Sequence, residues 1–439
     1  MLFRSFGIRY NLYGFTGLTI VLTLSLFTVA YMNLQGMLRA LDPSLDEAAT
    51  NLGASKWHVF RTITLPMLIP GIASSFLLLF VEAIADLANP LVLGGDFTVL
   101  ASRVYIAISG EYDIFAGSVL SVILLVPSLT VFIVQRYWVS RKSVISVTGK
   151  PAGKPTMITN PIVRWGLFAL TMFFSLLILL IYGTVFVGAF TELFGINYTP
   201  TLRHFEFVVL GLGSQAMMDT TKMSLIATPI AGVLGMLIAW LVVRKHFTGR
   251  SLIDFISMLG IALPGTVLGI GYLLAFNKPA DIGSITLLPP LAGGTAIAGG
   301  TIALILAYVV RSVPAGVRAG VASLQQIDPS IEEASISLGA DNATTFRKVT
   351  LPLIRPAFLT GLVYSFARSM TSLSAVIFLS TPYAKIMTAQ ILNEVDAGRF
   401  GNAFAYCDIL IIMVLIVIGI LYFVVGTTTG VERDFGVSL

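Results

Sequence analysis

Long apolar segments with almost no charge are the feature that most restricts how this chain can fold. An α-helix needs about 20 mostly apolar residues to cross the hydrocarbon layer of a membrane. Only 11% of the 439 residues are charged, against about 25% in an ordinary soluble domain. We therefore expect an all-α polytopic membrane protein. Nine segments have the required length and composition: Tyr13–Met32, Met67–Pro90, Ala116–Tyr137, Arg164–Phe186, Met223–Val243, Leu252–Phe276, Ala296–Val313, Leu353–Phe378 and Ala403–Val425.

A polar linker, Ser140–Pro161, separates the first three apolar segments from the other six. It contains Arg141, Lys142, Lys150 and Lys154, and basic residues concentrate in the cytoplasmic loops of membrane proteins. If the linker is cytoplasmic and every segment crosses once, the C-terminus and most other Lys and Arg residues are cytoplasmic too. Such loops account for the formal net charge of +5, so we expect no nucleic-acid partner.

Two of the predicted cytoplasmic loops match each other without a gap at a constant offset of 286 residues. The first loop reads LDPSLDEAATNLGASKWHVFRTITLPMLIPG from Leu41. The second reads IDPSIEEASISLGADNATTFRKVTLPLIRPA from Ile327. So many matches within one loop indicate a duplicated module.

Each copy has the sequence signals of two short helices followed by a membrane helix. Asp-Pro-Ser is a helix start, and acidic residues in the first turn suit the helix dipole. Gly53 or Gly339 permits the left-handed turn that ends the first short helix. Phe60 and Phe346 are candidate apolar contacts of the second, and Thr-Leu-Pro opens the next membrane segment. The alternative is a duplicated loop that rests on lipid headgroups, which needs only an apolar face and basic residues.

The pattern E-A-A-x(3)-G-A, followed by Thr-Leu-Pro, resembles the EAA loop of ABC importer permeases. It stands at Glu47–Pro66 and, with Ser335 in place of the second alanine, at Glu333–Pro352. The resemblance implies that each loop docks as a coupling helix on an ATP-hydrolysing subunit. The residues that it implies for this contact are Glu47, Ala48, Gly53, Ala54, Glu333, Ala334, Gly339 and Ala340.

The resemblance extends over essentially the whole chain to fused double permeases for iron(III) and related solutes. Leu263–Phe276 (LPGTVLGIGYLLAF) and Phe80–Gly95 (FVEAIADLANPLVLGG) are similar to that branch. It implies two tandem MetI-like modules, 1–139 and 162–439, joined by the linker 140–161, in a bacterial inner membrane. The implied partners are an ATP-binding cassette ATPase dimer, an extracytoplasmic solute-binding protein and membrane lipid.

Iron(III) is the first expected solute, and 2-aminoethylphosphonate, a polyamine or another small solute are the alternatives within this branch. A secondary transporter is a competing class, because it too would have repeats and charges within the membrane. It would not need duplicated glycine-containing cytoplasmic helices. A channel or a membrane scaffold is a third class. It predicts that removing either EAA loop has no effect on the association of an ATPase with the chain.

The repeat also predicts that the first module lacks its N-terminal part. Its three apolar segments correspond to the last three of the second module, so three segments have no counterpart before Met1. We expect a truncated or misassigned start, with a natural short variant as the alternative.

Ionisable residues within the apolar segments are candidates for a solute pathway, since such residues usually face the protein interior. Glu82 and Asp86 are one helical turn apart, and the repeat offset aligns them with Arg368 and Ser372. We expect Glu82 and Arg368 to line the passage or to latch its closed state, with Asn89 and Ser374 nearby. The alternative is a structural ion pair without a role in transport.

The sequence gives no sign of catalysis or of a bound cofactor. Gly149–Pro155 (GKPAGKP) departs from a phosphate-binding loop in its spacing and in the Pro155 that follows Lys154. ATP would therefore be hydrolysed by a partner. His58, His204 and His246 are far apart in the sequence and show no metal-ligand spacing, and the one cysteine, Cys407, excludes an intrachain disulfide.

Overall fold

A computed structural model of the chain describes residues 12–41, 43–139, 160–282 and 285–429. In these ranges the regular structure is helical apart from two antiparallel hairpins. The chain divides into two compact units, unit 1 (Met1–Thr184) and unit 2 (Val185–Leu439), and each is described by itself. The predicted linker lies outside the described residues up to position 159.

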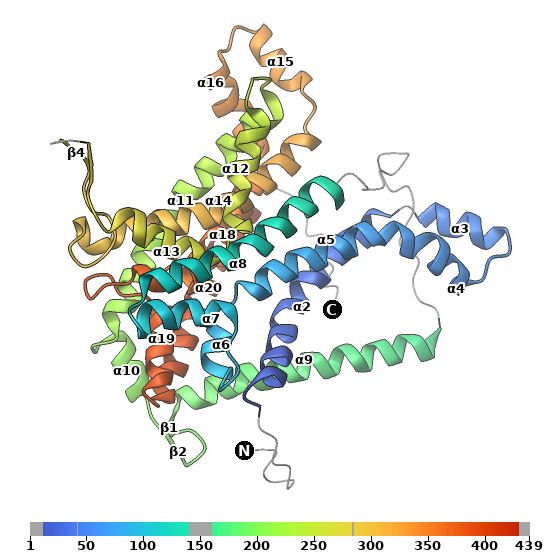
Figure 1. The fold of residues 1–439 in the computed structure, drawn as a ribbon. Coiled ribbons are helices and arrows are strands. Elements are labelled where there is room, and N and C mark those ends of the chain that lie inside the picture. The colour runs from blue at the N-terminus through green and yellow to red at the C-terminus, as the bar shows by residue number, and fades with distance from the viewer. Residues whose placement is uncertain (1–11, 42, 140–159, 283–284, 430–439) are drawn as a thin grey trace. The chain divides into compact units, whose positions relative to one another are not determined.

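Unit 1 contains the first helices of Figure 1. Three π-helical turns continue its helices, at Phe60–Thr64, Ile106–Gly110 and Gln135–Val139. The last helix of the unit, α9, ends in unit 2. The helices are α2 (Phe15–Ala40), α3 (Pro43–Asn51), α4 (Lys56–Val59), α5 (Leu65–Ile84), α6 (Ala88–Leu93), α7 (Leu100–Tyr105), α8 (Ile114–Val134) and α9 (Pro161–Ala189).

Helices α2 and α5 of unit 1 pack closely because small and polar residues lie between them. The Met37 side chain covers Gly71, where a Cβ atom would overlap with the Met37 sulfur. Asn33 Nδ2 donates a hydrogen bond to Ser75 Oγ at 2.8 Å. Small residues and interhelical hydrogen bonds stabilise helix pairs in lipid, where burial of apolar surface contributes little.

Unit 2 contains the remaining helices and both hairpins. Strands β1 (Thr191–Leu193) and β2 (Asn197–Pro200) follow α9, and β3 (Ala280–Ile282) and β4 (Ile285–Leu288) connect α13 with α14. The helices are α10 (Arg203–Val209), α11 (Ser214–Arg244), α12 (Arg250–Ala262), α13 (Gly265–Phe276), α14 (Thr301–Gln326), α15 (Ser330–Ser337), α16 (Asn342–Thr345), α17 (Leu351–Leu353), α18 (Arg355–Thr371), α19 (Met387–Asp396) and α20 (Phe400–Thr429).

Seven of the predicted membrane segments overlap single long helices, and the other two overlap bent helix pairs. In the described residues, seven helices are long and apolar enough to cross a membrane, or up to nine if each bent pair is one span. Leu252–Phe276 bends by 106° between α12 and α13. The other bent pair, Asn342–Leu353 with Arg355–Thr371, bends by 76° before α18 and begins before the predicted segment Leu353–Phe378. These two segments therefore depart from continuous helices. The first bend lies at Pro264, whose ψ of 138° is extended, and α18 begins with Pro356 in its first turn.

Helices α11, α14 and α18 form the centre of unit 2 and meet at three glycines. A Cβ atom at Gly235 would lie 3.0 Å from backbone atoms of Gly316, and one at Gly361 would lie 3.4 Å from Gly316 Cα. The backbones therefore touch at this crossing. Next to it, Met236 of α11 belongs to a buried cluster with Ala239, Leu324 and Ile354, which are also buried.

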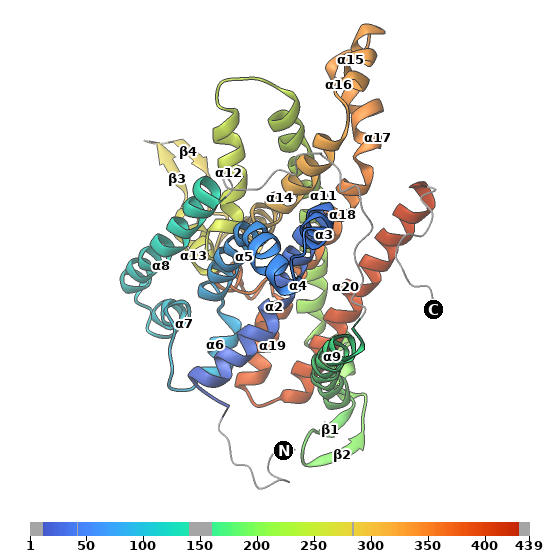
Figure 2. The ribbon, with the colours of Figure 1, turned by 90° about the vertical axis from the view of Figure 1, so that its right-hand side faces the viewer.

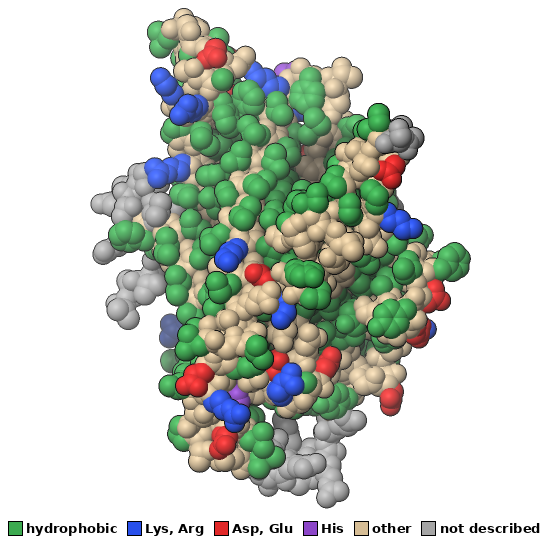
Figure 3. All heavy atoms as spheres, turned by 90° about the vertical axis from the view of Figure 1, so that its left-hand side faces the viewer, with side chains coloured by type: hydrophobic (Ala, Val, Ile, Leu, Met, Phe, Trp, Pro, Cys, Tyr) green, Lys and Arg blue, Asp and Glu red, His purple; other side chains and the backbone are tan. Residues whose placement is uncertain are grey.

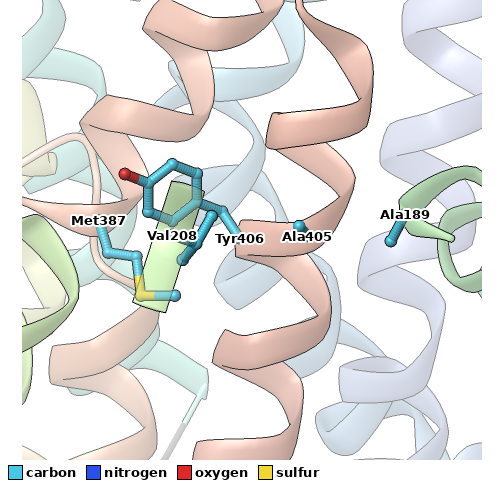
Figure 4. Close-up of a cluster of buried hydrophobic side chains, with 5 residues drawn as sticks. All are labelled: Ala189, Val208, Met387, Ala405 and Tyr406. Carbon is cyan, nitrogen blue, oxygen red and sulfur yellow. The ribbon is translucent and has the colours of Figure 1, made fainter. Parts of the chain in front are cut away.

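The two ends of unit 2 differ in structure. Helices α15 and α16 project from one end, and the β1–β2 hairpin lies at the opposite end beside α19 (Figures 1 and 2). Near that hairpin, Met387, Val208 and Tyr406 lie together, with Ala405 on the side of α20 toward Ala189 (Figure 4). Hydrophobic side chains cover much of the face in Figure 3, with Lys and Arg side chains both near the α15–α16 end and toward the opposite end.

Candidate coupling segments

The second predicted EAA loop forms two short helices, α15 and α16, joined by a left-handed glycine. Gly339 has a φ of 91°, in the region that costs other residues about 1–2 kcal/mol. Asp341 Oδ1 caps α16 by accepting a hydrogen bond from Thr344 N at 3.0 Å, and the hydrogen bonds from Thr344 lower the pKa of Asp341. Asp328 Oδ1 accepts one from Ser330 N at 2.9 Å, and this contact lowers the pKa of Asp328.

The first EAA loop has the same local structure. Gly53 has a φ of 87° after α3, as Gly339 has after α15. Ser55 takes the place of Asp341 as the cap and accepts a hydrogen bond from His58 N at 3.3 Å. In both copies a five-residue π-helical turn follows, Phe60–Thr64 and Phe346–Thr350. The predicted duplication is therefore a duplication of conformation as well as of sequence.

One side-chain hydrogen bond occurs at equivalent positions of both loops. Thr350 Oγ1 donates to Glu332 Oε1 at 3.1 Å, and Thr64 Oγ1 donates to Asp46 Oδ1 at 3.4 Å. The threonine is that of Thr-Leu-Pro, and the acid immediately precedes the glutamate that the repeat matches. Each bond thus ties the first short helix to the start of the next long helix.

The C-terminal end of α11 holds the second loop through two basic residues. Arg244 Nε lies 3.1 Å from Glu332 Oε1, and Arg244 Nη2 donates to Ile327 O at 2.8 Å. Lys245 Nζ donates to Asn342 Oδ1 at 2.8 Å and lies over the ring of Trp240. The side chains of the Arg244–Glu332 pair are only 10% and 12% exposed. Partial burial of this kind makes loss of one partner costly.

The residues that the resemblance implies for partner contact mostly face outward. Two leucines at equivalent positions, Leu52 and Leu338, are 90% and 89% exposed. Each leucine directly precedes the left-handed glycine of its loop, so its side chain is open to contact by a partner. The implied residues Glu47, Ala48, Gly53, Glu333, Ala334 and Gly339 are exposed, while Ala54 and Ala340 are half-buried.

Comparison with known families places this duplicated segment in context. The family model described as "Binding-protein-dependent transport system inner membrane component" matches residues 1–144 and 231–428. The chain belongs to this family. Each of the two matched ranges contains one EAA loop. Membership agrees with a multi-pass inner membrane permease, and the fused arrangement of two modules agrees with the match in two ranges.

The chain is also similar to proteins named as ferric transport permeases. The "Ferric transport system permease protein FbpB" of Actinobacillus pleuropneumoniae is 37% identical over 95% of this chain and 59% of its own length. A "Putative ferric transport system permease protein FbpB 1" of Haemophilus influenzae is 38% identical over 90% of this chain and 62% of its own. The chain thus spans about three fifths of the length of these relatives. A solved bacterial alginate ABC transporter bound to its periplasmic protein has 16% identity, a TM-score of 0.49, and covers 59% of this chain and 93% of its own.

The predicted pathway residues belong to different units of this family member. Glu82 lies in the last turn of α5, while Asp86 lies beyond the end of that helix, and both are half-buried. Arg368 lies in the last turn of α18 and is half-buried. Ser372 follows α18, and its carbonyl oxygen accepts a hydrogen bond from Thr388 Oγ1 at 2.8 Å. The pairing of Glu82 with Arg368 stays a prediction, because it joins unit 1 with unit 2.

A second arginine of unit 2 lies at the bend between α12 and α13. A Cβ atom at Gly265 would overlap with Ser374 Oγ and contact Arg311 Nη1, so these two side chains lie against the start of α13. Arg311 is half-buried on α14. Among the described residues, no three His, Cys, Asp or Glu side chains lie together as potential metal ligands.

Sequence reasoning missed Arg244, Glu332, the two exposed leucines and Arg311. The leucines were within the matched repeat, but an apolar residue in an apolar chain gives no signal of exposure. The acidic residue that accepts the threonine hydrogen bond is Asp46 in the first loop and Glu332 in the second. A search for identical residues in the two loops therefore does not find this pair. Arg244 and Arg311 become visible only through their neighbours in the fold.

Proposed function

We propose that this chain is the membrane-spanning permease subunit of an ATP-driven importer. In this proposal it forms the translocation pathway for iron(III) that an extracytoplasmic binding protein delivers. A separate ATPase dimer docks on the two EAA loops and supplies the energy. The observation that carries the proposal is the duplicated loop, in which the same left-handed glycine, the same threonine–acid bond and the same exposed leucine recur. Membership of the binding-protein-dependent family and the names of the ferric relatives support the importer class and the solute.

The contacts of the second loop suggest how motion at the loop would reach the pathway. A partner that covers Leu338 would push on α15, which is joined to α11 through Glu332 and Arg244. The hydrogen bond that Thr350 donates to Glu332 joins α15 to the turn before α17 and α18. Helices α11 and α18 both pack on α14 at the glycine crossing. Because packed helices move as rigid bodies, a push on α15 would be transmitted to the centre of unit 2.

The orientation belongs to the proposal as well. Basic residues favour the cytoplasmic side of a membrane. Six of them lie in the sequence near the end of unit 2 that carries the second EAA loop: Arg244, Lys245, Arg250, Arg347, Lys348 and Arg355. We infer that the EAA loops and the C-terminus are cytoplasmic and that the β1–β2 hairpin is extracytoplasmic. A cysteine introduced at Ser337 or at Tyr198, labelled in intact cells with a membrane-impermeant reagent, tests this orientation. Labelling of position 337, without labelling of position 198, would reverse it.

Uptake by cells that lack the gene tests the activity. We expect that radiolabelled iron(III) uptake is lost on deletion, returns with the wild-type chain, and stays low with serine at both Leu52 and Leu338. The same cells are tested with 2-aminoethylphosphonate and a polyamine. Loss of uptake of one of those instead of iron would correct the solute while leaving the importer class intact. Uptake that continues after ATP depletion, driven by an ion gradient, would show a secondary transporter.

A further inference from the structure

A buried carboxylate begins a chain of hydrogen bonds at the hairpin end of unit 2. The side chain of Glu394, on α19, is 1% exposed. Arg399 binds both of its oxygens, at 2.6 Å and 3.0 Å, and Asn402 Nδ2 and Gln390 Nε2 donate to it at 3.0 Å and 3.1 Å. Burial raises the pKa of Glu394, but these hydrogen bonds outweigh it and the net pKa is lowered. Glu394 is therefore ionised at neutral pH and can only accept hydrogen bonds.

The ionised carboxylate fixes the orientation of the Asn402 amide. Since Glu394 Oε2 only accepts, the amide nitrogen Nδ2 must face it, and the amide oxygen Oδ1 faces the other way. Oδ1 lies 2.9 Å from Nδ1 of His204 on α10. An amide oxygen has no hydrogen to give, so His204 Nδ1 must carry the proton of this hydrogen bond.

The second ring nitrogen of His204 also faces an acceptor. Nε2 lies 3.2 Å from the backbone oxygen of Thr191, on β1. A neutral imidazole donates from one nitrogen only, whereas the imidazolium ion donates from both. The protonated ring of His204 can therefore donate to both acceptors, Asn402 Oδ1 and Thr191 O. The neutral ring keeps the hydrogen bond to Asn402, but its Nε2 lone pair faces the Thr191 oxygen without a hydrogen between them.

The ring is enclosed on one side by backbone. A Cβ atom at Gly401 would overlap with the imidazole of His204, so the ring rests directly on the start of α20. Glu394 and Arg399 neutralise each other, and Glu192 accepts hydrogen bonds from Asn197 and Thr199 within the hairpin. The charged groups on the elements around the ring are Arg203 and Glu206 on α10, Glu394 and Asp396 on α19, Arg399 before α20, Asp408 on α20, and Glu192 on β1.

We propose that His204 is a proton-dependent latch that joins the β1–β2 hairpin to α20. With the ring protonated, the bonds to Thr191 and Asn402 hold the hairpin and α10 against the start of α20. When the ring loses its proton, one bond is lost and the hairpin loosens. The latch follows from contacts within unit 2, and only its position on the extracytoplasmic face rests on the proposed function.

Hydrogen exchange of the purified chain in detergent tests the latch without any transport assay. The readout is the amides of residues 191–201, among which Thr201 N donates to Phe190 O at 2.8 Å. Rates are corrected for the intrinsic effect of pH. We expect protection of these amides to fall on the order of tenfold between about pH 5.5 and pH 8, because a hydrogen bond from a charged donor is about twice as strong as a neutral one.

Two substitutions remove the latch and one serves as the control. His204→Gln removes the imidazole ring, and Asn402→Ala removes the acceptor of Nδ1, so in both variants we expect the same protection at the two pH values. His246→Gln changes an exposed histidine after α11 and should keep the wild-type response. Equal wild-type protection at both pH values, or a pH response that survives in His204→Gln, would overturn the latch. Neither outcome bears on whether the chain transports iron(III).

Discussion

Arg244 at the end of α11 and Glu332 on α15 form an ion pair of 3.1 Å that anchors the second EAA loop to the centre of unit 2. The same Glu332 oxygen accepts from Thr350, so a single carboxylate joins three segments of the chain. The glutamate that the family resemblance singles out, Glu333, is the adjacent residue and is exposed. We therefore expect Glu332 to hold the loop to the rest of unit 2 and Glu333 to contact a partner.

Replacing Glu332 by alanine should destabilise unit 2. The change leaves the mostly buried Arg244 without this carboxylate, and removal of one partner of a buried pair costs about 3 kcal/mol. We expect the free energy of unfolding in detergent, followed by tryptophan fluorescence, to fall by that amount. Glu333→Ala is the matched control and should change it by less than about 0.5 kcal/mol, as exposed sites do. Equal effects of the two substitutions would contradict the anchoring role of Glu332.

Serine in place of Leu338 should weaken ATPase binding without weakening the fold. Burial of a leucine at an interface contributes about 1.5–3 kcal/mol, so loss of the side chain should reduce affinity about tenfold or more. The dissociation constant for the purified ATPase subunit measures this change. Leu212→Ser, at an 87% exposed leucine before α11, is the control and should leave affinity unchanged. An unchanged affinity in Leu338→Ser would place the partner contact elsewhere.

Alanine at Gly339 should disturb the turn between α15 and α16 through the backbone alone. No atom lies within 4 Å of a Cβ atom built there, so its φ of 91° is the only obstacle. We expect a loss of about 1 kcal/mol in unfolding free energy, with weaker ATPase stimulation by solute. Asn tolerates the left-handed region better, so Gly339→Asn should recover part of the loss. Gly271→Ala, with equal space and an ordinary φ, is the control, and a loss of the same size there would refute the argument.

Much of the fold could be predicted from the sequence because a helix that crosses a membrane needs a long, mostly apolar segment, and such segments are visible in the composition. Seven of the nine apolar segments overlap a single long helix, Leu252–Phe276 coincides with one bent pair, and Leu353–Phe378 begins at the end of the first helix of the other pair. The bends at Pro264 and before Arg355 were not predicted, since hydropathy measures how apolar a segment is and does not measure its direction. The proline at 264 is the local signal that could have indicated the first bend.

The EAA loops could be located because they repeat, but their anchors could not. Gly53 and Gly339 adopt the left-handed conformation that the sequence predicts, and the short helices end before them. Glu332 and Arg244 are 88 residues apart, and no local pattern links two such positions. The chain of contacts from Glu394 to His204 spans α19, α20 and α10 and is likewise invisible without the fold. Residue roles that depend on tertiary neighbours are therefore the part that sequence reasoning misses.

Acid should weaken the hairpin end of unit 2 through Glu394. Its pKa is lowered from an ordinary value of 4.5, against the effect of burial, by hydrogen bonds from Arg399, Asn402 and Gln390. A carboxyl group whose pKa is lower in the folded than in the unfolded chain stabilises the fold at any pH above its unfolded pKa. This stabilisation is lost as the pH falls through the lowered pKa of the folded chain. We expect Glu394→Gln to unfold at a lower temperature than wild type at pH 7, and the difference to shrink progressively as the pH falls below the ordinary value of 4.5. Asp396→Asn, at an exposed acid two residues away, is the control. A difference between wild type and Glu394→Gln that persists undiminished to pH 3 would show that the loss is one of packing and not of charge.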